Sequence, residues 1–218
     1  MIAIVDYRAG NLTSVARALH FLGFACRVTG DPGVLREAER ILIPGVGAAG
    51  AAMASLRENG LDQALQGAFA ARKPLLGICL GCQIVLGRSE ENDARCLNLI
   101  PGRVRAFPDG LRAPDGRRLK IPHMGWNTLR LRSRHPVFAG LEEGDSFYFV
   151  HGYYPQPEDP ACVVAETEHG IRFPSALASG SLVAVQFHPE KSGRPGLRLL
   201  ENFCRWNPAG GTGGAEPC

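Results

Sequence analysis

The chain has 218 residues and a mass of 23.4 kDa, about the size of one α/β domain or two small ones. With 45% hydrophobic and 21% charged residues, its composition is that of a globular protein and excludes a disordered polymer. No apolar run reaches the roughly 18 residues that a transmembrane helix needs, and the first residues lack the pattern of a signal peptide. Seven cysteines at irregular spacing do not form a disulfide framework, so we expect a reducing, cytoplasmic location.

The net charge of +3 does not by itself indicate a nucleic-acid partner, but the charge is unevenly distributed. The segment Arg95–Arg134 holds ten Lys or Arg residues against Asp109 and Asp115, a balance of +8. The other 14 basic and 19 acidic residues give the remainder of the chain a balance of −5. The basic segment indicates a phosphate-bearing substrate, an acidic partner or a solvated loop region, and the sequence leaves these three open.

Strand and helix patterns alternate in the first half of the chain. In chain order, the predicted elements are a strand at Ile2–Val5, a helix with apolar positions Val15, Ala18, Leu19 and Leu22 that ends at Gly23, strands at Phe24–Thr29 and Ile41–Ile43, helices at Ala48–Leu56 and Leu61–Ala70, and a strand at Leu75–Ile78. Helical spacing of apolar residues marks the helices, and short continuous apolar runs mark the strands. Such an order indicates right-handed βαβ units and a parallel sheet.

After about Arg95, short strand patterns follow one another closely. The predicted elements are strands at Asn127–Leu131, Phe147–Val150, Cys162–Glu166 and Val183–Phe187, a helix at Gly196–Trp206 and a tail at Asn207–Cys218. This pattern is typical of an antiparallel or mixed extension of the sheet. Because no repeat or linker interrupts the chain, we predict one domain over residues 1–206, followed by a disordered tail.

The strongest local signal is the segment Gly77-Ile78-Cys79-Leu80-Gly81, in which a buried strand runs into a cysteine with a glycine two positions to either side. This is the pattern of a nucleophile elbow with cysteine in place of serine. A helix that begins at the cysteine would favour its thiolate form. Two alternatives stay open: a buried structural cysteine at a tight turn, and a redox pair of Cys79 with Cys82. Zinc is disfavoured because the chain lacks a second closely spaced pair of ligands.

A second candidate lies where the apolar run Val183–Phe187 ends in His188-Pro189-Glu190. Pro189 disfavours the helical conformation for His188. In an extended chain, residues two apart project to the same side, so Glu190 is placed to orient His188 as a base toward Cys79. The alternative is a histidine at a strand end beside a surface carboxylate.

A third candidate is the turn Pro44-Gly45-Val46-Gly47 after the third predicted strand. A glycine-rich turn there presents free backbone N–H groups, and with the N–H of Leu80 these would form an oxyanion hole. A phosphate cradle is the alternative, but no Lys-Ser/Thr pair follows, which excludes a P-loop.

All three segments fall at the carboxyl ends of predicted strands, where open α/β sheets place their sites. Together, Gly77–Gln83, Pro44–Gly47 and His188-Pro189-Glu190 resemble the class I (triad) glutamine amidotransferases. Further blocks resemble, over about residues 2–206, the family of glutaminase subunits of imidazole glycerol phosphate synthase: Asp6–Asn11, Ile121–Asn127, Phe147–Tyr154 and Gln186–Ser192. The resemblance implies a flavodoxin-like α/β fold, with a mostly parallel open sheet, an antiparallel extension and helices on both faces.

In that family a cysteine attacks the side-chain amide of glutamine, ammonia leaves, and water cleaves the glutamyl thioester. The resemblance implies these roles: catalysis by Cys79, His188 and Glu190; oxyanion-hole N–H groups at Val46, Gly47 and Leu80; substrate contacts at Gln83, Glu91 and Tyr148; partner contacts at Asn11, Trp126 and Lys191. It implies a heterodimer with the synthase (cyclase) subunit, which uses the ammonia to make imidazole glycerol phosphate and aminoimidazole carboxamide ribotide in histidine biosynthesis. No cofactor, metal, nucleic acid or membrane is implied.

Three positions depart from the family pattern. Arg8 stands where a small residue is usual, Cys82 replaces a methionine, and Gly152 replaces Ser or Thr. The alternatives are the glutaminase subunit of another synthase, such as anthranilate synthase, and a catalytically silent regulatory subunit of the same fold. A cysteine peptidase with a similar elbow is a third, for which the sequence has no peptide-binding signature.

Overall fold

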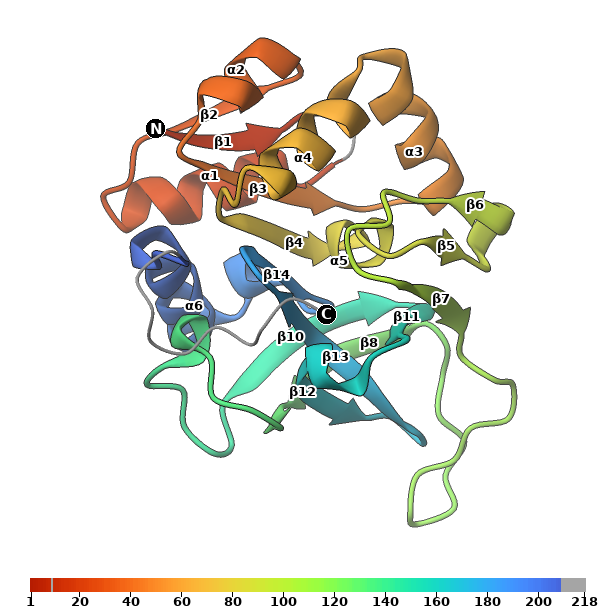
Figure 1. Cartoon of the computed structure of the whole chain (residues 1–218). Helices are drawn as coiled ribbons and strands as arrows, with labels where there is room; N and C mark the ends of the chain where they lie inside the picture. The colour runs from red at the N-terminus through yellow and green to blue at the C-terminus, as the bar shows by residue number, and fades with distance from the viewer. Residues whose placement is uncertain (9, 209–218) are drawn as a thin grey trace.

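A computed structural model describes residues 1–8 and 10–208. Its main sheet runs through the middle of the molecule and has eight strands within the described residues, in the order β2-β1-β3-β4-β14-β13-β12-β9 (Figure 1). The parallel strands are β2 (Cys26–Thr29), β1 (Ile2–Val5), β3 (Arg40–Gly45), β4 (Leu75–Cys79) and β14 (Leu182–Val185). The antiparallel strands are β13 (Arg172–Ser179), β12 (Val163–Glu168) and β9 (Arg130–Leu131). The parallel part has the flavodoxin-like strand order, which confirms the predicted fold class.

The described residues form two smaller sheets as well. One pairs β10 (Ser146–His151) with β8 (His123–Thr128) in antiparallel register. The other contains β11 (Tyr153–Pro157), β7 (Gly102–Ala106), β5 (Arg88–Ser89) and β6 (Ala94–Arg95), and of these β5, β6 and β7 lie at the right of Figure 1. The described ranges also contain short 3-10 turns: η1 (Glu91–Asp93), η2 (Pro136–Phe138), η3 (Pro160–Cys162) and η4 (Pro189–Lys191).

Helices cover both faces of the parallel strands (Figure 1). They are α1 (Leu12–Phe21), α2 (Pro32–Glu37), α3 (Ala49–Glu58), α4 (Leu61–Ala70), α5 (Leu80–Ile84) and α6 (Gly193–Arg205). Alternate strand residues enter two separate cores: Ile41 and Ile43 join the core under α3 and α4, whereas Leu42 joins the core under α1 and α6. This alternation follows from the period of two in a strand, and burial on both faces explains why the parallel strands are almost wholly apolar.

The predicted elements of the first half are largely confirmed, with α4 at its predicted bounds and β2 starting at Cys26 rather than Phe24. Helix α2 was missed because Pro32-Gly33 reads as a turn, although Asp31 caps the helix through the N–H of Gly33 at 2.7 Å.

The second half departs more from the prediction. One strand predicted at Asn127–Leu131 is two, because β8 ends at Thr128 and β9 begins at Arg130 in another sheet. Helix α6 begins three residues before the predicted start, and β14 ends at Val185, two residues before the predicted end. Strands β5, β6, β7, β11 and β13 were not predicted.

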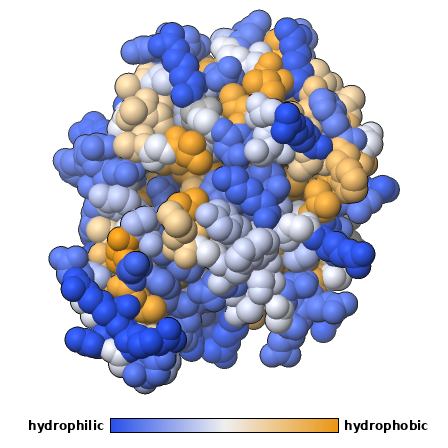
Figure 2. All heavy atoms as spheres, turned by 180° about the vertical axis from the view of Figure 1, so that it is seen from behind, coloured by the Kyte–Doolittle hydropathy of each residue, from blue (hydrophilic) through white to orange (hydrophobic). Residues whose placement is uncertain are grey.

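The single domain over 1–206 stays a prediction, and of the predicted tail all but Asn207 and Pro208 lies outside the described residues. No helix in the described ranges is long and apolar enough to cross a membrane. Seen from behind, hydrophobic side chains form small separate patches among hydrophilic ones (Figure 2).

Candidate active site

Four loops meet at the carboxyl ends of parallel strands. Asn11 follows β1, Val46 follows β3, Cys79 is the last residue of β4, and His188 follows β14. These strands are neighbours in the order β1-β3-β4-β14, so their ends lie along one edge of the sheet. Open α/β sheets bind ligands at this edge, and the fold therefore brings the three sequence motifs together.

Cys79 lies in a strained turn between β4 and α5. Its backbone dihedrals, φ 54° and ψ −106°, lie outside the regions that residues other than glycine ordinarily adopt. The Cys79 residue is buried. The chain tolerates this turn only with glycine nearby. A Cβ on Gly81 would lie 1.7 Å from the carbonyl oxygen of Ile43, and a Cβ on Gly77 would lie 2.8 Å from the carbonyl oxygen of Gly81. The geometry is that of a nucleophile elbow.

His188 and Glu190 form a buried pair. The Nδ1 of His188 lies 2.7 Å from Oε1 of Glu190, and both side chains are fully buried. The other ring nitrogen, Nε2, has no hydrogen-bond partner in the described part of the chain. Burial alone lowers the pKa of His188, but interactions with Cys79 and Glu190 outweigh it and raise the pKa to about 9. The free imidazolium nitrogen is thus available on the side away from Glu190.

Asn11 belongs to this group, although the family resemblance implied only a partner contact for it. Its backbone is left-handed, with φ 77°, and Asn is one of the few residues that tolerate this conformation. Its side-chain Nδ2 donates a hydrogen bond to Oε1 of Glu190 and lies 3.4 Å from Nδ1 of His188. Asn11 therefore holds the carboxylate that orients the imidazole.

Ser192 is a second residue that the sequence reasoning missed. Its hydroxyl donates to the carbonyl of His188 at 2.6 Å and accepts from the N–H of Tyr148 at 3.0 Å. The N–H of His188 in turn donates to the carbonyl of Tyr148 at 2.9 Å. These bonds fasten the His188 backbone to β10. A serine two residues after Glu190 was the available signal.

The predicted oxyanion loop combines an unusual backbone with close packing. Gly47 has φ 113°, a conformation that favours glycine. A Cβ on Gly45 would lie 1.8 Å from the hydroxyl of Tyr7, so Tyr7 packs directly against this loop. That hydroxyl is buried without a hydrogen-bond partner in the described residues, and burial together with the charge of Cys79 raises the pKa of Tyr7. Leu80 is buried next to Cys79, while Val46 is partly exposed.

The three predicted substrate residues lie around the same edge. Glu91 accepts a hydrogen bond at 2.7 Å from the N–H of Ala49, the first residue of α3, directly after the oxyanion loop. Gln83 is buried, and its amide nitrogen donates to the carbonyl of Tyr153 and to Gln186. Tyr148 is half-buried on β10, with its ring 6.4 Å from that of His188. The substrate roles of these residues stay predictions.

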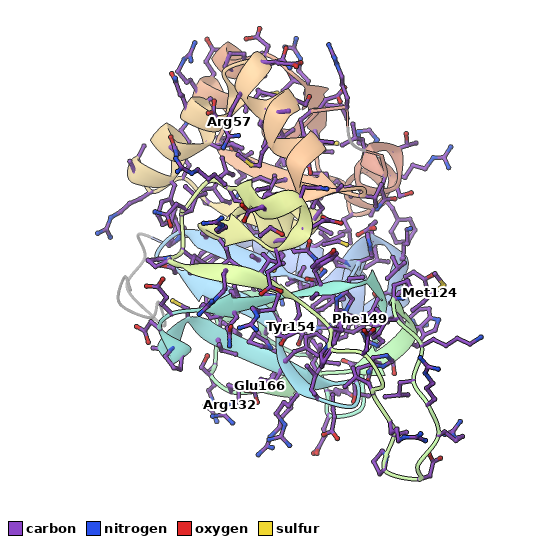
Figure 3. All side chains as sticks on the ribbon, turned by 90° about the vertical axis from the view of Figure 1, so that its right-hand side faces the viewer. Arg57, Met124, Arg132, Phe149, Tyr154 and Glu166 are labelled. Carbon is purple, nitrogen blue, oxygen red and sulfur yellow. The ribbon has the colours of Figure 1, made fainter. Side chains whose placement is uncertain are left out.

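Two of the predicted partner-contact residues lie close to the ring of Tyr148. Trp126 pairs with it across β8 and β10 at a ring distance of 6.0 Å, and Nζ of Lys191 lies 5.8 Å from the ring centre. Trp126 is 60% exposed and Met124, two residues earlier on the same strand, is 64% exposed. Figure 3 shows Met124 at the outer edge of the molecule. The partner-contact roles of these residues stay predictions.

The three departures from the family pattern leave this geometry intact. Arg8 is exposed, with φ 62°, and its Nη1 lies 3.9 Å from Oε2 of Glu58. Cys82 is fully buried in the core under α3 and α4, and burial together with Cys79 raises its pKa. A Cβ on Gly152 would meet only Ile121, at 3.9 Å, so the Ser or Thr of the family pattern would fit there.

The basic segment is spread over several elements, and three of its ten basic residues form ion pairs within the described residues. Arg105 on β7 lies 2.8 Å from Glu90, and Arg117 lies 2.6 Å from Asp115. Arg132, next to β9, lies 3.5 Å from Glu166, and Figure 3 shows these two residues together at the lower edge. A cavity of about 670 Å³ lies beside β9 and β12, far along the sheet from β4. In the described ranges, no group of three or more His, Cys, Asp and Glu residues is arranged to hold a metal ion.

Sequence comparisons agree with this geometry. Residues 3–206 match the model of the family described as glutamine amidotransferase class-I. Among curated proteins, the imidazole glycerol phosphate synthase subunit HisH of Desulfovibrio desulfuricans is 52% identical over 203 residues, which cover 93% of each chain. The HisH protein of Methylococcus capsulatus is 51% identical over 211 residues, which cover 95% of this chain and 97% of that protein.

Solved structures share the fold at low sequence identity. A crystal structure described as a glutamine amidotransferase has a TM-score of 0.72 and 18% identity, and covers 94% of this chain and 100% of its own. The structure of PurLQS from Thermotoga maritima has a TM-score of 0.70 and 18% identity, with 94% and 97% of the two chains covered. At such identity these neighbours establish a common architecture only.

Proposed function

The chain belongs to the glutamine amidotransferase class-I family, and from this we propose that it is the glutaminase subunit of imidazole glycerol phosphate synthase. Identity of about 50% to HisH proteins over nearly the whole of both chains favours this reading over the glutaminase of another synthase. The observation that carries the chemistry is the buried pair of His188 and Glu190 at the sheet edge where the Cys79 elbow ends. This pair favours a working enzyme over a silent subunit.

In the proposed reaction, the thiolate of Cys79 attacks the side-chain carbonyl carbon of glutamine and forms a C–S bond. The negative charge that develops on the carbonyl oxygen is held by the N–H groups of Val46, Gly47 and Leu80. His188, whose raised pKa keeps it protonated at neutral pH, gives its Nε2 proton to the amide nitrogen. The C–N bond then breaks, and ammonia leaves behind a glutamyl thioester.

Water completes the cycle. Neutral His188 takes a proton from a water molecule, whose oxygen attacks the thioester carbonyl, and the C–S bond breaks to release glutamate. Glu190 accepts from Nδ1 of His188 and so keeps the proton on that nitrogen, while the side-chain amide of Asn11 fixes the carboxylate. Glu91 would receive the α-ammonium of glutamine, and the hydrogen bond of its carboxylate to the N–H of Ala49, just after the oxyanion loop, supports this role.

Ammonia would pass to the synthase (cyclase) subunit, which makes imidazole glycerol phosphate and aminoimidazole carboxamide ribotide. The HisH relatives are named as subunits, which supports a heterodimer of this kind. Trp126, Lys191 and Tyr148 form the proposed contact surface beside the site. The proposed location is the cytoplasm, which the relatives named as subunits of a synthase support.

The replacement Cys79→Ala tests the proposal. In the complex with the synthase subunit, glutamine-dependent synthesis should fall by at least about a thousandfold, because the nucleophile is lost, while synthesis from added ammonia continues. Cys96→Ala, at a half-buried thiol outside the site, is the matched control and should retain both activities. Full glutamine-dependent synthesis by the Cys79→Ala complex would overturn the assignment of the nucleophile.

A further inference from the structure

A chain of buried hydrogen bonds ends at the sulfur of Cys79. Its last link is the amide Nε2 of Gln186, which donates to Sγ at 3.8 Å. The oxygen of the same amide accepts from Nε2 of Gln83 at 3.0 Å. The second hydrogen on that nitrogen is donated to the carbonyl of Tyr153 at 3.1 Å. Gln186 is fully buried and Gln83 is 5% exposed, so solvent does not compete for these bonds.

The carbonyl of Tyr153 is shared with a pair of buried histidines. Nδ1 of His151 lies 2.7 Å from this carbonyl, and Nε2 of His151 lies 3.0 Å from Nδ1 of His123. Nε2 of His123 lies 3.2 Å from the amide nitrogen of Asn127, which also donates to the carbonyl of Glu168 at 2.9 Å. The hydrogen bonds thus extend from β8 to the nucleophile.

Backbone carbonyls determine the direction of every bond in the chain, because they accept and cannot donate. Facing the carbonyl of Tyr153, His151 must carry a proton on Nδ1. At the other end, the nitrogen of Asn127 is identified by its bond to the carbonyl of Glu168 and must donate to Nε2 of His123. His123 therefore donates from Nδ1, and Nε2 of His151 accepts. This arrangement requires both histidines to be neutral. Burial, followed by the neighbouring histidines, lowers the pKa of each to about 3, in agreement with this requirement.

The same reasoning determines the group that faces the sulfur. Gln83 must present its nitrogen to the carbonyl of Tyr153, and its other hydrogen then occupies the oxygen of Gln186. Gln186 is left with only its N–H groups to turn toward Cys79. A donor at this place favours the thiolate over the thiol, because the thiolate is the stronger acceptor.

We propose that Gln186 is a positioning residue for the nucleophile. The series of hydrogen bonds through Gln83, His151 and His123 holds the Gln186 amide with its nitrogen toward Cys79. The inference deepens the proposed glutaminase function and rests on it for its biological meaning. It also gives a role to the histidines of two sequence blocks, Ile121–Asn127 and Phe147–Tyr154, that the triad does not use.

The test measures how fast iodoacetamide alkylates Cys79 in the full chain between pH 5 and 9, with the modified residue identified by peptide mass spectrometry. Gln186→Glu keeps the size of the side chain and the acceptor for Gln83, but turns a carboxylate oxygen toward the sulfur. We expect the curve of alkylation rate against pH to move to higher pH in this variant, and the alkylation rate at pH 7 to fall about tenfold. The other groups around the sulfur are unchanged in this variant: His188, Tyr7, Cys82 and the carbonyl of Val150.

Two variants of His151 separate the hydrogen bond from the packing. His151→Asn retains a donor at the position of Nδ1 and should keep a profile near that of the unchanged chain. His151→Leu removes the donor and should slow alkylation severalfold. His135→Asn, at a buried histidine without a link to Cys79, is the control and should change nothing.

An unchanged pH profile in Gln186→Glu would overturn the proposal, and this variant keeps the test decisive if His151→Leu does not fold. Alkylation needs neither glutamine nor the partner, so the outcome is independent of the glutaminase assay. If the complex of the unsubstituted chain with its partner does not hydrolyse glutamine, the proposed function is contradicted. If that complex is active but the pH dependence of alkylation is the same in Gln186→Glu, only the positioning role is contradicted.

Discussion

At the scale of single residues, the site depends on backbone positions that have no room for a side chain. Gly81 lies two residues after the nucleophile, where the backbone of α5 meets the backbone of β3. An added methyl group would approach the carbonyl oxygen of Ile43 to 1.7 Å, and two buried main chains would have to separate to accept it. We expect Gly81→Ala to lower the free energy of unfolding by at least about 3 kcal/mol, measured by urea denaturation.

A matched glycine tests whether this cost comes from the close approach. Gly67 lies in the exposed face of α4, and a Cβ there would meet no atom within 4 Å. Gly67→Ala should raise the free energy of unfolding by about 0.5–1 kcal/mol, because alanine favours the helix. Equal stability of the two variants would contradict the packing argument.

The residues that motifs identify and those that only folding assembles differ in kind. Cys79 and His188 were predicted because each lies in a short local pattern that its chemistry requires. Asn11 was placed at the partner, and its contact with Glu190, 179 positions away, arises only when β1 and β14 lie in one sheet. The hydroxyl of Tyr7 against Gly45 has the same origin. Local patterns carry no information on such contacts.

At the scale of elements, the parallel half was predictable and the antiparallel half was not, for a physical reason. Strands such as β1 and β4 are buried on both faces and read as continuous apolar runs. Strand β7 has an exposed and a half-buried arginine around one buried valine, and β5 has only two residues, so neither shows a clear apolar pattern. The sequence did not indicate the break between β8 and β9, because the chain passes from one sheet to another at Leu129 without a glycine or proline.

The turn η2 carries a pH-dependent cap. Nδ1 of His135 accepts a hydrogen bond from the N–H of Val137 at 3.2 Å, and burial lowers the pKa of this histidine to about 4. In the unfolded chain this histidine has a pKa near 6.5, so between about pH 6.5 and 4 it binds a proton there that it does not bind in the folded chain. As pH falls from about 6.5 to about 4, His135 therefore costs up to about 1.4 kcal/mol of stability per pH unit.

His135→Asn should remove this cost, because the amide oxygen accepts the same bond and does not titrate. Denaturation of both proteins at several pH values would show the variant gaining stability relative to the unchanged chain as pH falls below 6.5. Parallel stability curves would mean that His135 is not a neutral buried group in the folded state.

At the scale of the whole molecule, the candidate site and the proposed contact surface lie at one edge of the sheet. The carboxyl ends of four parallel strands assemble the site, and the added sheet of β8 and β10 lies beside it with Trp126 and Met124 exposed. A glutaminase that delivers ammonia to a partner needs its site next to the contact surface, since ammonia released into solvent is lost. The pairing of Trp126 with Tyr148, whose backbone holds His188, connects the two surfaces through one strand pair.

Trp126→Ala tests the contact surface. Because 60% of this side chain is exposed, its removal should change the free energy of unfolding by less than about 1 kcal/mol. A large aromatic side chain at the centre of an interface contributes about 2 kcal/mol or more to binding, so affinity for the synthase subunit should fall about thirtyfold in calorimetric titration. Phe21→Ala, at the end of α1 remote from Asn11 and 78% exposed, removes a similar apolar group and should leave affinity unchanged. If both variants bind as tightly as the unchanged chain, the partner lies on another face, and the exposed side chains of β8 need a different explanation.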